Sequence, residues 1–222
     1  MIKIGTSGFS FPDWIKTVYP QVLEQSEWLS YYQSHYKFNT VEINSTYYTL
    51  VSDKTFSGME KKTGKGFEFI VKGYKGFTHD PFDTRLETKP SMEQVKGDID
   101  KFIYSIQPLK SANKLGAVLL QFPVFFYPTN QSRDYLLLCR EKFNDIPLII
   151  EFRNFSWDRN DTFAFLEINK MGYCIVDEPN SFIPEVQKMA KKSGKTFVFF
   201  NNCHAGQAVH NAMQLRELLL KN

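Results

Sequence analysis

Two glutamates stand inside short apolar segments and are the strongest candidates for proton transfer. Glu42 lies in the segment TVEIN, and Glu151 follows three apolar residues in LIIEFR. Two carboxylates in one site can divide into a proton donor and a proton acceptor when their surroundings separate their pKa values. We therefore expect Glu42 and Glu151 to be the catalytic pair of an enzyme.

Two cationic side chains stand at the ends of similar segments. Lys72 closes FEFIVK, and Arg153 stands two residues after Glu151. Side chains alternate along a strand, so Glu151 and Arg153 are expected to share one face. Lys72 and Arg153 could bind an anionic group of a substrate or keep a glutamate ionised. The alternative is a structural ion-pair network, because charged groups inside a core must be paired.

Further polar and aromatic residues at the ends of these segments are predicted to contact the substrate. Aromatic rings beside fixed polar groups suit a sugar or a nucleobase, through stacking and hydrogen bonds. Core packing is the alternative for the aromatic residues, and loop hydrogen bonding is the alternative for the asparagines and the histidine. The predicted contacts are Asn44, Tyr47, His79, Gln121, Trp157, Asp177, Asn201 and Asn202.

A divalent metal could be held by carboxylate and imidazole groups of the same set. The donors would be Glu42, Glu151, Asp177 and His79, and oxygen and imidazole ligands are common in metal sites. No HxxE or HExxH spacing supports such a site, so the cofactor is left open. Ser7 lacks the accompanying histidine and aspartate order of a catalytic triad, and it is predicted to serve a turn.

Seven short segments rich in apolar and β-branched residues predict strands, and seven amphipathic segments between them predict helices. The alternating order predicts parallel strands joined by helical crossovers. The predicted strands are Ile2–Thr6, Thr40–Asn44, Phe67–Tyr74, Ala117–Phe122, Leu148–Arg153, Tyr173–Asp177 and Thr196–Asn201. The predicted helices are Glu27–Phe38, Asp53–Lys62, Met92–Leu109, Ser132–Phe143, Thr162–Met171, Ile183–Lys192 and Ala208–Leu220.

Two architectures fit this order, a TIM-type (β/α) barrel and an open doubly wound sheet. The first turn, GTSGFSF, has neither the GxGxxG pattern nor a P-loop, which weakens the nucleotide-binding open sheet. Almost every predicted strand ends in a polar residue, and TIM barrels take their catalytic groups from the carboxyl ends of their strands. We therefore expect a TIM-type barrel formed by one domain, residues 1–222.

Six motifs occur in order between Ile4 and Leu215: IGTSGFSFPDW, FNTVEINSTYYTL, GFEFIVKGYKGFTH, KLGAVLLQFP, EFRNFSW and VFFNNCHAGQAVHNAMQL. Together they resemble the YecE-like family, also known as domain of unknown function 72 or UPF0759. The resemblance implies a TIM barrel, and it brings no established reaction. The predicted site residues Glu42, Lys72 and Glu151 stand at positions that match these motifs.

One feature of the YecE-like family is not visible in this sequence. The resemblance implies a further strand between those that end at Asp177 and at Asn201, with an Arg-x-His-Gly motif at its end. Only EPNSFIPEVQKMAKKSGK connects these two strands here, so seven strands are readable where a closed barrel has eight. Either the strand is deleted, or residues are missing near Pro184–Lys188.

Composition limits the class of function. Of the 222 residues, 42% are hydrophobic and 23% are charged, and the net charge of +3 permits an anionic ligand without the concentrated charge of a dedicated nucleic-acid binder. Three widely spaced cysteines and the absence of a long apolar run predict a cytoplasmic protein without a membrane span.

The sequence favours an enzyme of hydrolase or isomerase type that acts on a small sugar-like or nucleotide-like substrate, with an anionic group, at the carboxyl-terminal mouth of the barrel. A nucleic-acid-binding module with an aromatic and basic rim is one alternative. A non-catalytic scaffold with a structural ion-pair network is another. The oligomeric state is not predicted.

Overall fold

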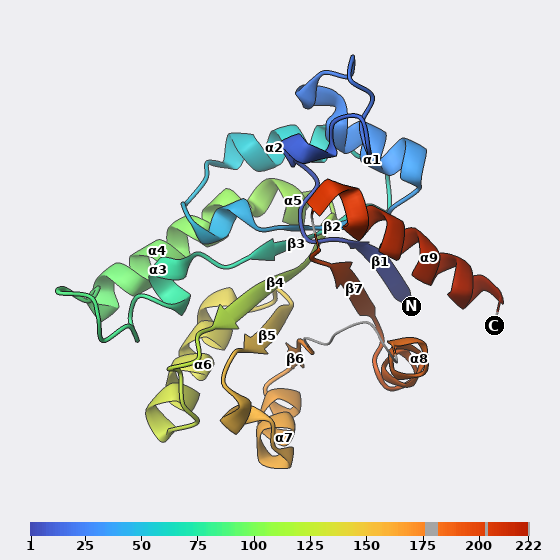
Figure 1. Cartoon of the computed structure of the whole chain (residues 1–222). Helices are drawn as coiled ribbons and strands as arrows, with labels where there is room; N and C mark the ends of the chain where they lie inside the picture. Colours follow the sequence, from blue (N-terminus) through green and yellow to red (C-terminus); the bar gives the residue numbers. More distant parts are fainter. Residues whose placement is uncertain (176–181, 203, 222) are drawn as a thin grey trace. The chain divides into compact units, whose positions relative to one another are not determined.

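The computed structural model describes residues 1–175, 182–202 and 204–221 (Figure 1). They form two compact units, each built from separate stretches of the chain. The first unit comprises Met1–Asn44, Ser57–Phe69 and Asp177–Asn222, and the second comprises Ser45–Phe56 and Ile70–Val176. The single domain expected from the sequence stays a prediction.

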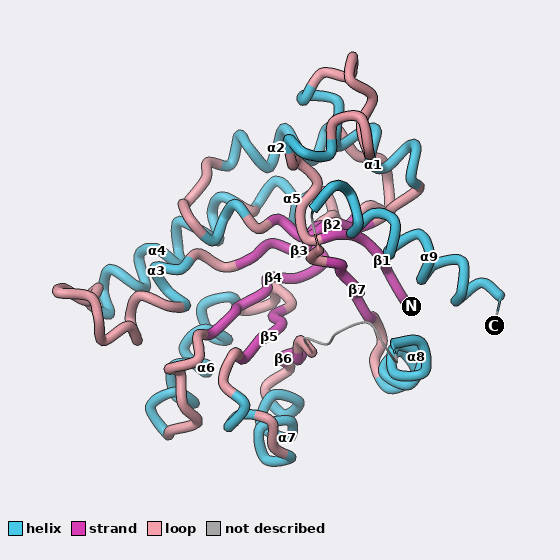
Figure 2. Tube along the Cα trace, viewed as in Figure 1, coloured by secondary structure: helices cyan, strands magenta, loops and turns pink. Residues whose placement is uncertain are grey.

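Six of the predicted strands are confirmed with small differences at their ends, and the remaining one, Tyr173–Asp177, shares only Tyr173 with the strand observed there (Figure 2). The sixth strand is shifted toward the amino terminus, and its predicted end at Asp177 lies outside the described residues. The preceding helix ends early, because Lys170 has a φ of 55° that a helix cannot continue through. The strands are β1 (Ile2–Thr6), β2 (Thr40–Ile43), β3 (Glu68–Lys72), β4 (Leu115–Phe122), β5 (Leu148–Phe152), β6 (Met171–Tyr173) and β7 (Thr196–Phe200).

The predicted helices are also present, and one of them is divided. The segment predicted as Met92–Leu109 breaks at Ile106, because Pro108 lacks the N–H that a continuous helix would need and instead stands in the first turn of the next helix. The helices are α1 (Trp28–Tyr36), α2 (Asp53–Lys61), α3 (Lys75–Thr78), α4 (Met92–Ser105), α5 (Gln107–Ser111), α6 (Asn130–Phe143), α7 (Asn160–Ile168), α8 (Phe182–Lys192) and α9 (Gln207–Lys221).

The strands form a two-stranded sheet, β1-β7, and a five-stranded sheet in the order β2-β3-β4-β5-β6. The pairs β1 with β7, β4 with β5 and β5 with β6 are parallel. The predicted α/β fold with parallel strands is therefore confirmed. Among the described residues the hydrogen-bonded sheets do not close on themselves, so the barrel stays a prediction.

The stretch between Asp177 and Thr196 contains a helix where the YecE-like resemblance implied a strand. Helix α8 covers Phe182–Lys192, so the predicted join near Pro184–Lys188 lies within one continuous helix. In the described part of this stretch, residues 182–195, no strand is present.

Close backbone contact holds the first unit together. A Cβ on Gly5 of β1 would lie 2.3 Å from the carbonyl oxygen of Thr40 in β2, so only glycine permits this approach. An isolated parallel bridge then joins Ser7 to Glu42, at the carboxyl ends of the two strands. This spacing brings side chains of β1 and β2 into direct contact.

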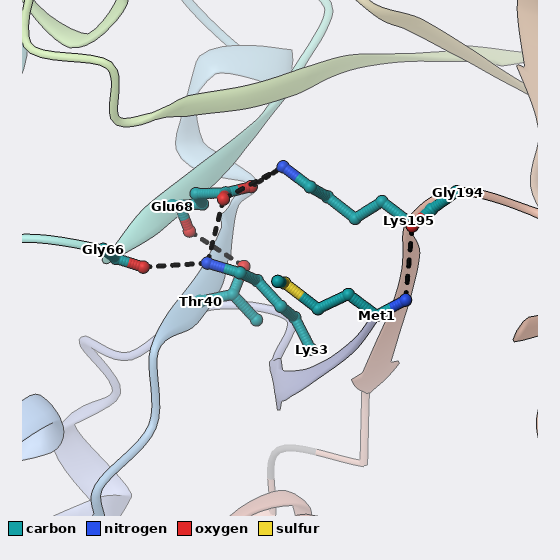
Figure 3. Close-up of polar contacts among 7 residues, drawn as sticks. All are labelled: Met1, Lys3, Thr40, Gly66, Glu68, Gly194 and Lys195. Carbon is teal, nitrogen blue, oxygen red and sulfur yellow. Dashed lines mark hydrogen bonds and ion pairs between the residues drawn. The ribbon is translucent and has the colours of Figure 1, made fainter.

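An ion-pair cluster lies near the amino ends of β1, β3 and β7, on elements of the first unit (Figure 3). Lys3 Nζ lies 2.9 Å from Glu68 Oε1 and donates a hydrogen bond of 2.8 Å to the carbonyl oxygen of Gly66. Lys195 Nζ lies 2.8 Å from Glu68 Oε2. The Lys3 side chain is only 5% exposed and that of Lys195 is 42% exposed, so Glu68 neutralises one buried and one half-exposed cation.

Candidate functional site

In the second unit, a buried glutamate is held at the carboxyl ends of β4 and β5. Parallel pairing places Gln121 directly opposite Glu151, so the two side chains leave the sheet on the same face. Gln121 Nε2 donates a hydrogen bond of 2.7 Å to Glu151 Oε1. Arg153 Nε lies 2.6 Å from the same oxygen. The predicted shared face of Glu151 and Arg153 is confirmed by this ion pair.

The two oxygens of Glu151 have different surroundings. Both contacts, from Gln121 and from Arg153, are made to Oε1. Within the described residues, Oε2 has no hydrogen-bond partner, and it is not among the buried polar atoms that lack one. A carboxylate that is fixed through one oxygen, while the other has no such partner, is suited to the role of a general base or acid.

A second group of side chains surrounds the carboxyl end of β3. Lys72 Nζ lies 5.3 Å from the centroid of the Tyr47 ring, a cation–π distance. The Tyr47 ring in turn meets the His79 ring edge to face, with centroids 4.9 Å apart. Thr46 Oγ1 donates a hydrogen bond of 2.6 Å to the carbonyl oxygen of Lys72 and so ties the Tyr47 loop to this strand. The structure thus brings together three of the predicted site residues.

The pKa of His79 depends on one cation from each of these two groups, Lys72 and Arg153. Burial of the ring, followed by the positive charges of Lys72 and Arg153, lowers the pKa of His79 from 6.5 to about 4. The imidazole is therefore neutral at physiological pH. Of the charges that act on this ring, those of Lys72 and Arg153 have the largest effects, and the negative charge of Asp83 opposes them.

The low pKa of His79 predicts how stability depends on pH. Between its unfolded value of 6.5 and its folded value of about 4, the unfolded chain binds a proton that the folded chain does not. The free energy of unfolding should therefore fall as the pH is lowered through this window, and it should do so less in His79→Asn. Urea unfolding of both proteins at about pH 7 and about pH 5 measures the difference. Parallel pH dependences would contradict the expectation.

In the first unit, the other predicted catalytic glutamate is paired with a serine. Ser7 Oγ donates a hydrogen bond of 2.9 Å to Glu42 Oε2, and the two residues are 5% and 7% exposed. This contact gives Ser7 a side-chain role that its turn sequence did not predict. Asn44 follows β2, and its Oδ1 atom is buried without a hydrogen-bond partner among the described residues, which leaves an acceptor for a donor group.

Of the two asparagines after β7, Asn202 lines a pocket. Asn201 and Asn202 are both exposed, and the carbonyl oxygen of Asn202 accepts a hydrogen bond of 3.0 Å from the backbone N–H of Ala208. The pocket has a volume of about 380 Å³. Its lining comes from the segment after β7 and the first turns of α9: Asn202, Ala205, Gly206, Gln207, His210 and Asn211.

Trp157 and Asp177 complete the set of predicted contacts. Trp157 is fully buried, and its Nε1 donates a hydrogen bond of 2.6 Å to the carbonyl oxygen of Phe126, so it has the core-packing role that was the alternative. Asp177 lies outside the described residues. No group of three or more His, Cys, Asp or Glu side chains in the described part of the chain is arranged to hold a metal ion. In the same part, no helix is long and apolar enough to span a membrane.

These observations define the class of protein: a parallel α/β protein with charged and polar side chains at the carboxyl ends of its strands. A family model described as "Protein of unknown function DUF72" matches residues 3–186. The chain belongs to this DUF72 family, which confirms the resemblance seen in its motifs.

Relatives of known sequence or structure agree with this assignment. The UPF0759 protein YunF of Bacillus subtilis is 32% identical over 209 residues, which cover 90% of this chain and 70% of that protein. The crystal structure of a DUF72 family protein from Thermotoga maritima is 31% identical, with a TM-score of 0.85 over 99% of both chains. A DUF72 family protein from Enterococcus faecalis is 25% identical, with a TM-score of 0.79 over 99% of this chain and 98% of the other.

Proposed function

We propose that this protein is an enzyme, of hydrolase or isomerase type, that acts on a sugar-like or nucleotide-like substrate with an anionic group. The observation that carries the proposal is Glu151, a buried carboxylate fixed through Oε1 by Gln121 and Arg153. Its other oxygen would exchange the proton. Lys72 and Arg153 would bind the anionic group. Both positive charges act on the neutral ring of His79, and both would attract an anion beside that ring.

A TIM-type barrel is the architecture that we propose for this enzyme. The first and last strands, β1 and β7, are hydrogen-bonded neighbours, and β2 to β6 follow one another in sequence order. A barrel requires both features, whereas a doubly wound sheet reverses its strand order at a switch point. Seven strands would then supply the mouth of the barrel.

Glu42 is the second carboxylate that we propose for proton transfer. Its hydrogen bond from Ser7 differs from the contacts of Glu151, and different surroundings allow two carboxylates to take opposite proton-transfer roles. Loss of turnover in both Glu42→Gln and Glu151→Gln would support a two-carboxylate mechanism. Loss in Glu151→Gln alone would leave Glu151 as the single acid or base.

Binding of an anion is the first part of the proposal to test. Titration with inorganic phosphate should show saturable binding, and Lys72→Met and Arg153→Met should each weaken it about 10-fold, since a charge-assisted hydrogen bond contributes about 1.5 kcal/mol or more. Lys101→Gln is the matched control, because Lys101 is an exposed cation on α4 whose side chain is 71% exposed. An equal loss in all three variants would indicate non-specific charge attraction and would contradict the site.

Turnover is the second part of the proposal to test. Wild-type protein is incubated with a panel of sugar phosphates and nucleotides, and products are followed by ³¹P NMR. Glu151→Gln should lower the rate on any substrate found by about 100-fold or more, while its unfolding transition stays cooperative. A variant that keeps the wild-type rate would exclude Glu151 as the acid or base.

A scaffold is the second candidate, because the same contacts of Glu151 also satisfy a structural ion pair. A structural role predicts that Glu151→Gln lowers stability and changes neither phosphate binding nor turnover. An enzyme predicts a loss of turnover that exceeds any loss of stability. Urea unfolding and the turnover assay, made on the same preparation, separate the two candidates.

A further inference from the structure

Thr78 makes two hydrogen-bond contacts through one hydroxyl group. It is the last residue of α3 and is fully buried. Its Oγ1 atom lies 3.2 Å from the carbonyl oxygen of Tyr74, one helical turn earlier. The same atom lies 3.0 Å from Nδ1 of the neighbouring His79. The hydroxyl therefore stands between a backbone carbonyl and an imidazole ring.

The hydrogen bond that Thr78 Oγ1 donates to the carbonyl oxygen of Tyr74 decides the roles at the second contact. A carbonyl oxygen can only accept, so the hydroxyl hydrogen of Thr78 is directed at Tyr74. A hydroxyl has a single hydrogen, and its oxygen must then accept at the other contact. His79 is neutral at physiological pH and has one N–H. That N–H must be at Nδ1, which leaves Nε2 with an unprotonated lone pair.

The unprotonated nitrogen stands in the group of residues already described. Among the described residues, Nε2 of His79 has no hydrogen-bond partner, and it is not one of the buried polar atoms without a partner. It is therefore accessible. Its ring meets Tyr47, and the charges of Lys72 and Arg153 act on it. Both cations would oppose protonation of Nε2, so this atom acts as a hydrogen-bond acceptor.

We propose that Thr78 is a positioning residue that fixes the Nδ1–H tautomer of His79, and that Nε2 of His79 accepts a hydrogen bond from a hydroxyl group of the substrate. The substrate is then an organic phosphate that also carries a hydroxyl, with the phosphate at Lys72 and Arg153. This inference rests on the proposed function for the identity of the site. Its first half, the tautomer, concerns the ligand-free protein and can be tested alone.

The tautomer is measured by ¹⁵N NMR of the histidine side chains. The signals of His79 are assigned by their absence from the spectrum of His79→Asn. In the wild type and in Thr78→Ser, Nδ1 should have the shift of a protonated nitrogen and Nε2 that of an unprotonated one. In Thr78→Val, which has the same shape without the hydroxyl, the Nε2–H form should appear. An Nε2–H form in the wild type, or an unchanged tautomer in Thr78→Val, would overturn the role of Thr78.

The acceptor role is measured with two ligands that differ by one hydroxyl, ethyl phosphate and 2-hydroxyethyl phosphate. The hydroxyl compound should bind about 5- to 10-fold more tightly to the wild type and to Thr78→Ser, as expected for one hydrogen bond of about 1 kcal/mol. The preference should fall in Thr78→Val, because an Nε2–H cannot accept from the hydroxyl and can only donate to its oxygen. Equal binding of both compounds to the wild type would overturn the acceptor role and leave the anion site intact. Binding of neither compound would overturn the proposed anion site and the ligand half of this inference together, whatever the tautomer.

Discussion

Replacing Trp157 with alanine is expected to lower the free energy of unfolding by about 4 kcal/mol. Its indole is fully buried and lies parallel to the Phe152 ring, with centroids 4.3 Å apart. It also stacks on Phe126 at 5.5 Å. The substitution removes this contact area, leaves a cavity and deprives the carbonyl oxygen of Phe126 of its hydrogen bond. Urea unfolding measures the loss.

Phe155 is the matched control, because it begins the same short helix, Phe155–Trp157. Its side chain is 94% exposed, so Phe155→Ala should change stability by less than about 0.5 kcal/mol. Trp157→Phe keeps most of the stacking contacts, so its loss of stability should lie between those of Trp157→Ala and Phe155→Ala. This variant keeps the test valid if Trp157→Ala does not fold. Similar costs for Phe155→Ala and Trp157→Phe would contradict the assignment of Trp157 to the core.

The contrast between these two aromatic residues shows what the sequence could not predict. Both stand in the motif RNFSW, and both have side chains that suit either a core or a ligand. Trp157 is buried against Phe152, which directly precedes this motif, and against Phe126, which comes from another part of the chain. A one-dimensional pattern therefore identified the loop as aromatic but not which ring faces solvent.

The polar strand ends could be predicted because they depend on local rules. Alternation along a strand places Glu151 and Arg153 on one face, and the in-register pairing of β4 with β5 adds Gln121. The role of Thr78 could not be predicted in this way. Helix α3, which carries Thr78, has only four residues, too few for a helical period to be visible.

The ion-pair cluster at the amino ends of the strands was also not predicted, although its consequences are large. Lys3, Glu68 and Lys195 are far apart in the sequence, and each stands at or near the start of a strand, where a charged residue is ordinarily taken to be solvated. The structure instead places Glu68 between both lysines (Figure 3). Long-range pairing of this kind becomes visible only when the strands are assembled.

Glu68→Gln is expected to lower the free energy of unfolding by about 3 kcal/mol at neutral pH. The substitution leaves the ammonium group of Lys3, whose side chain is only 5% exposed, without a counter-charge. Lys195→Gln is the control: the Lys195 side chain is 42% exposed, so its removal should cost less than about 1 kcal/mol. The double variant Lys3→Met/Glu68→Gln should recover much of the loss, because a buried pair replaced as a whole is often nearly neutral.

The pH dependence gives an independent measure of the same ion pair. Burial raises the pKa of Glu68, but the hydrogen bonds and charges of Lys195 and Lys3 outweigh this effect and lower it below its ordinary value of 4.5. A carboxyl group with a lowered folded pKa contributes stability that is complete above its unfolded pKa and is lost as the pH falls through its folded pKa. The difference in unfolding free energy between wild type and Glu68→Gln should therefore shrink on acidification below about pH 4.5. A difference that stays constant with pH would show that Glu68 contributes through packing and not through its charge.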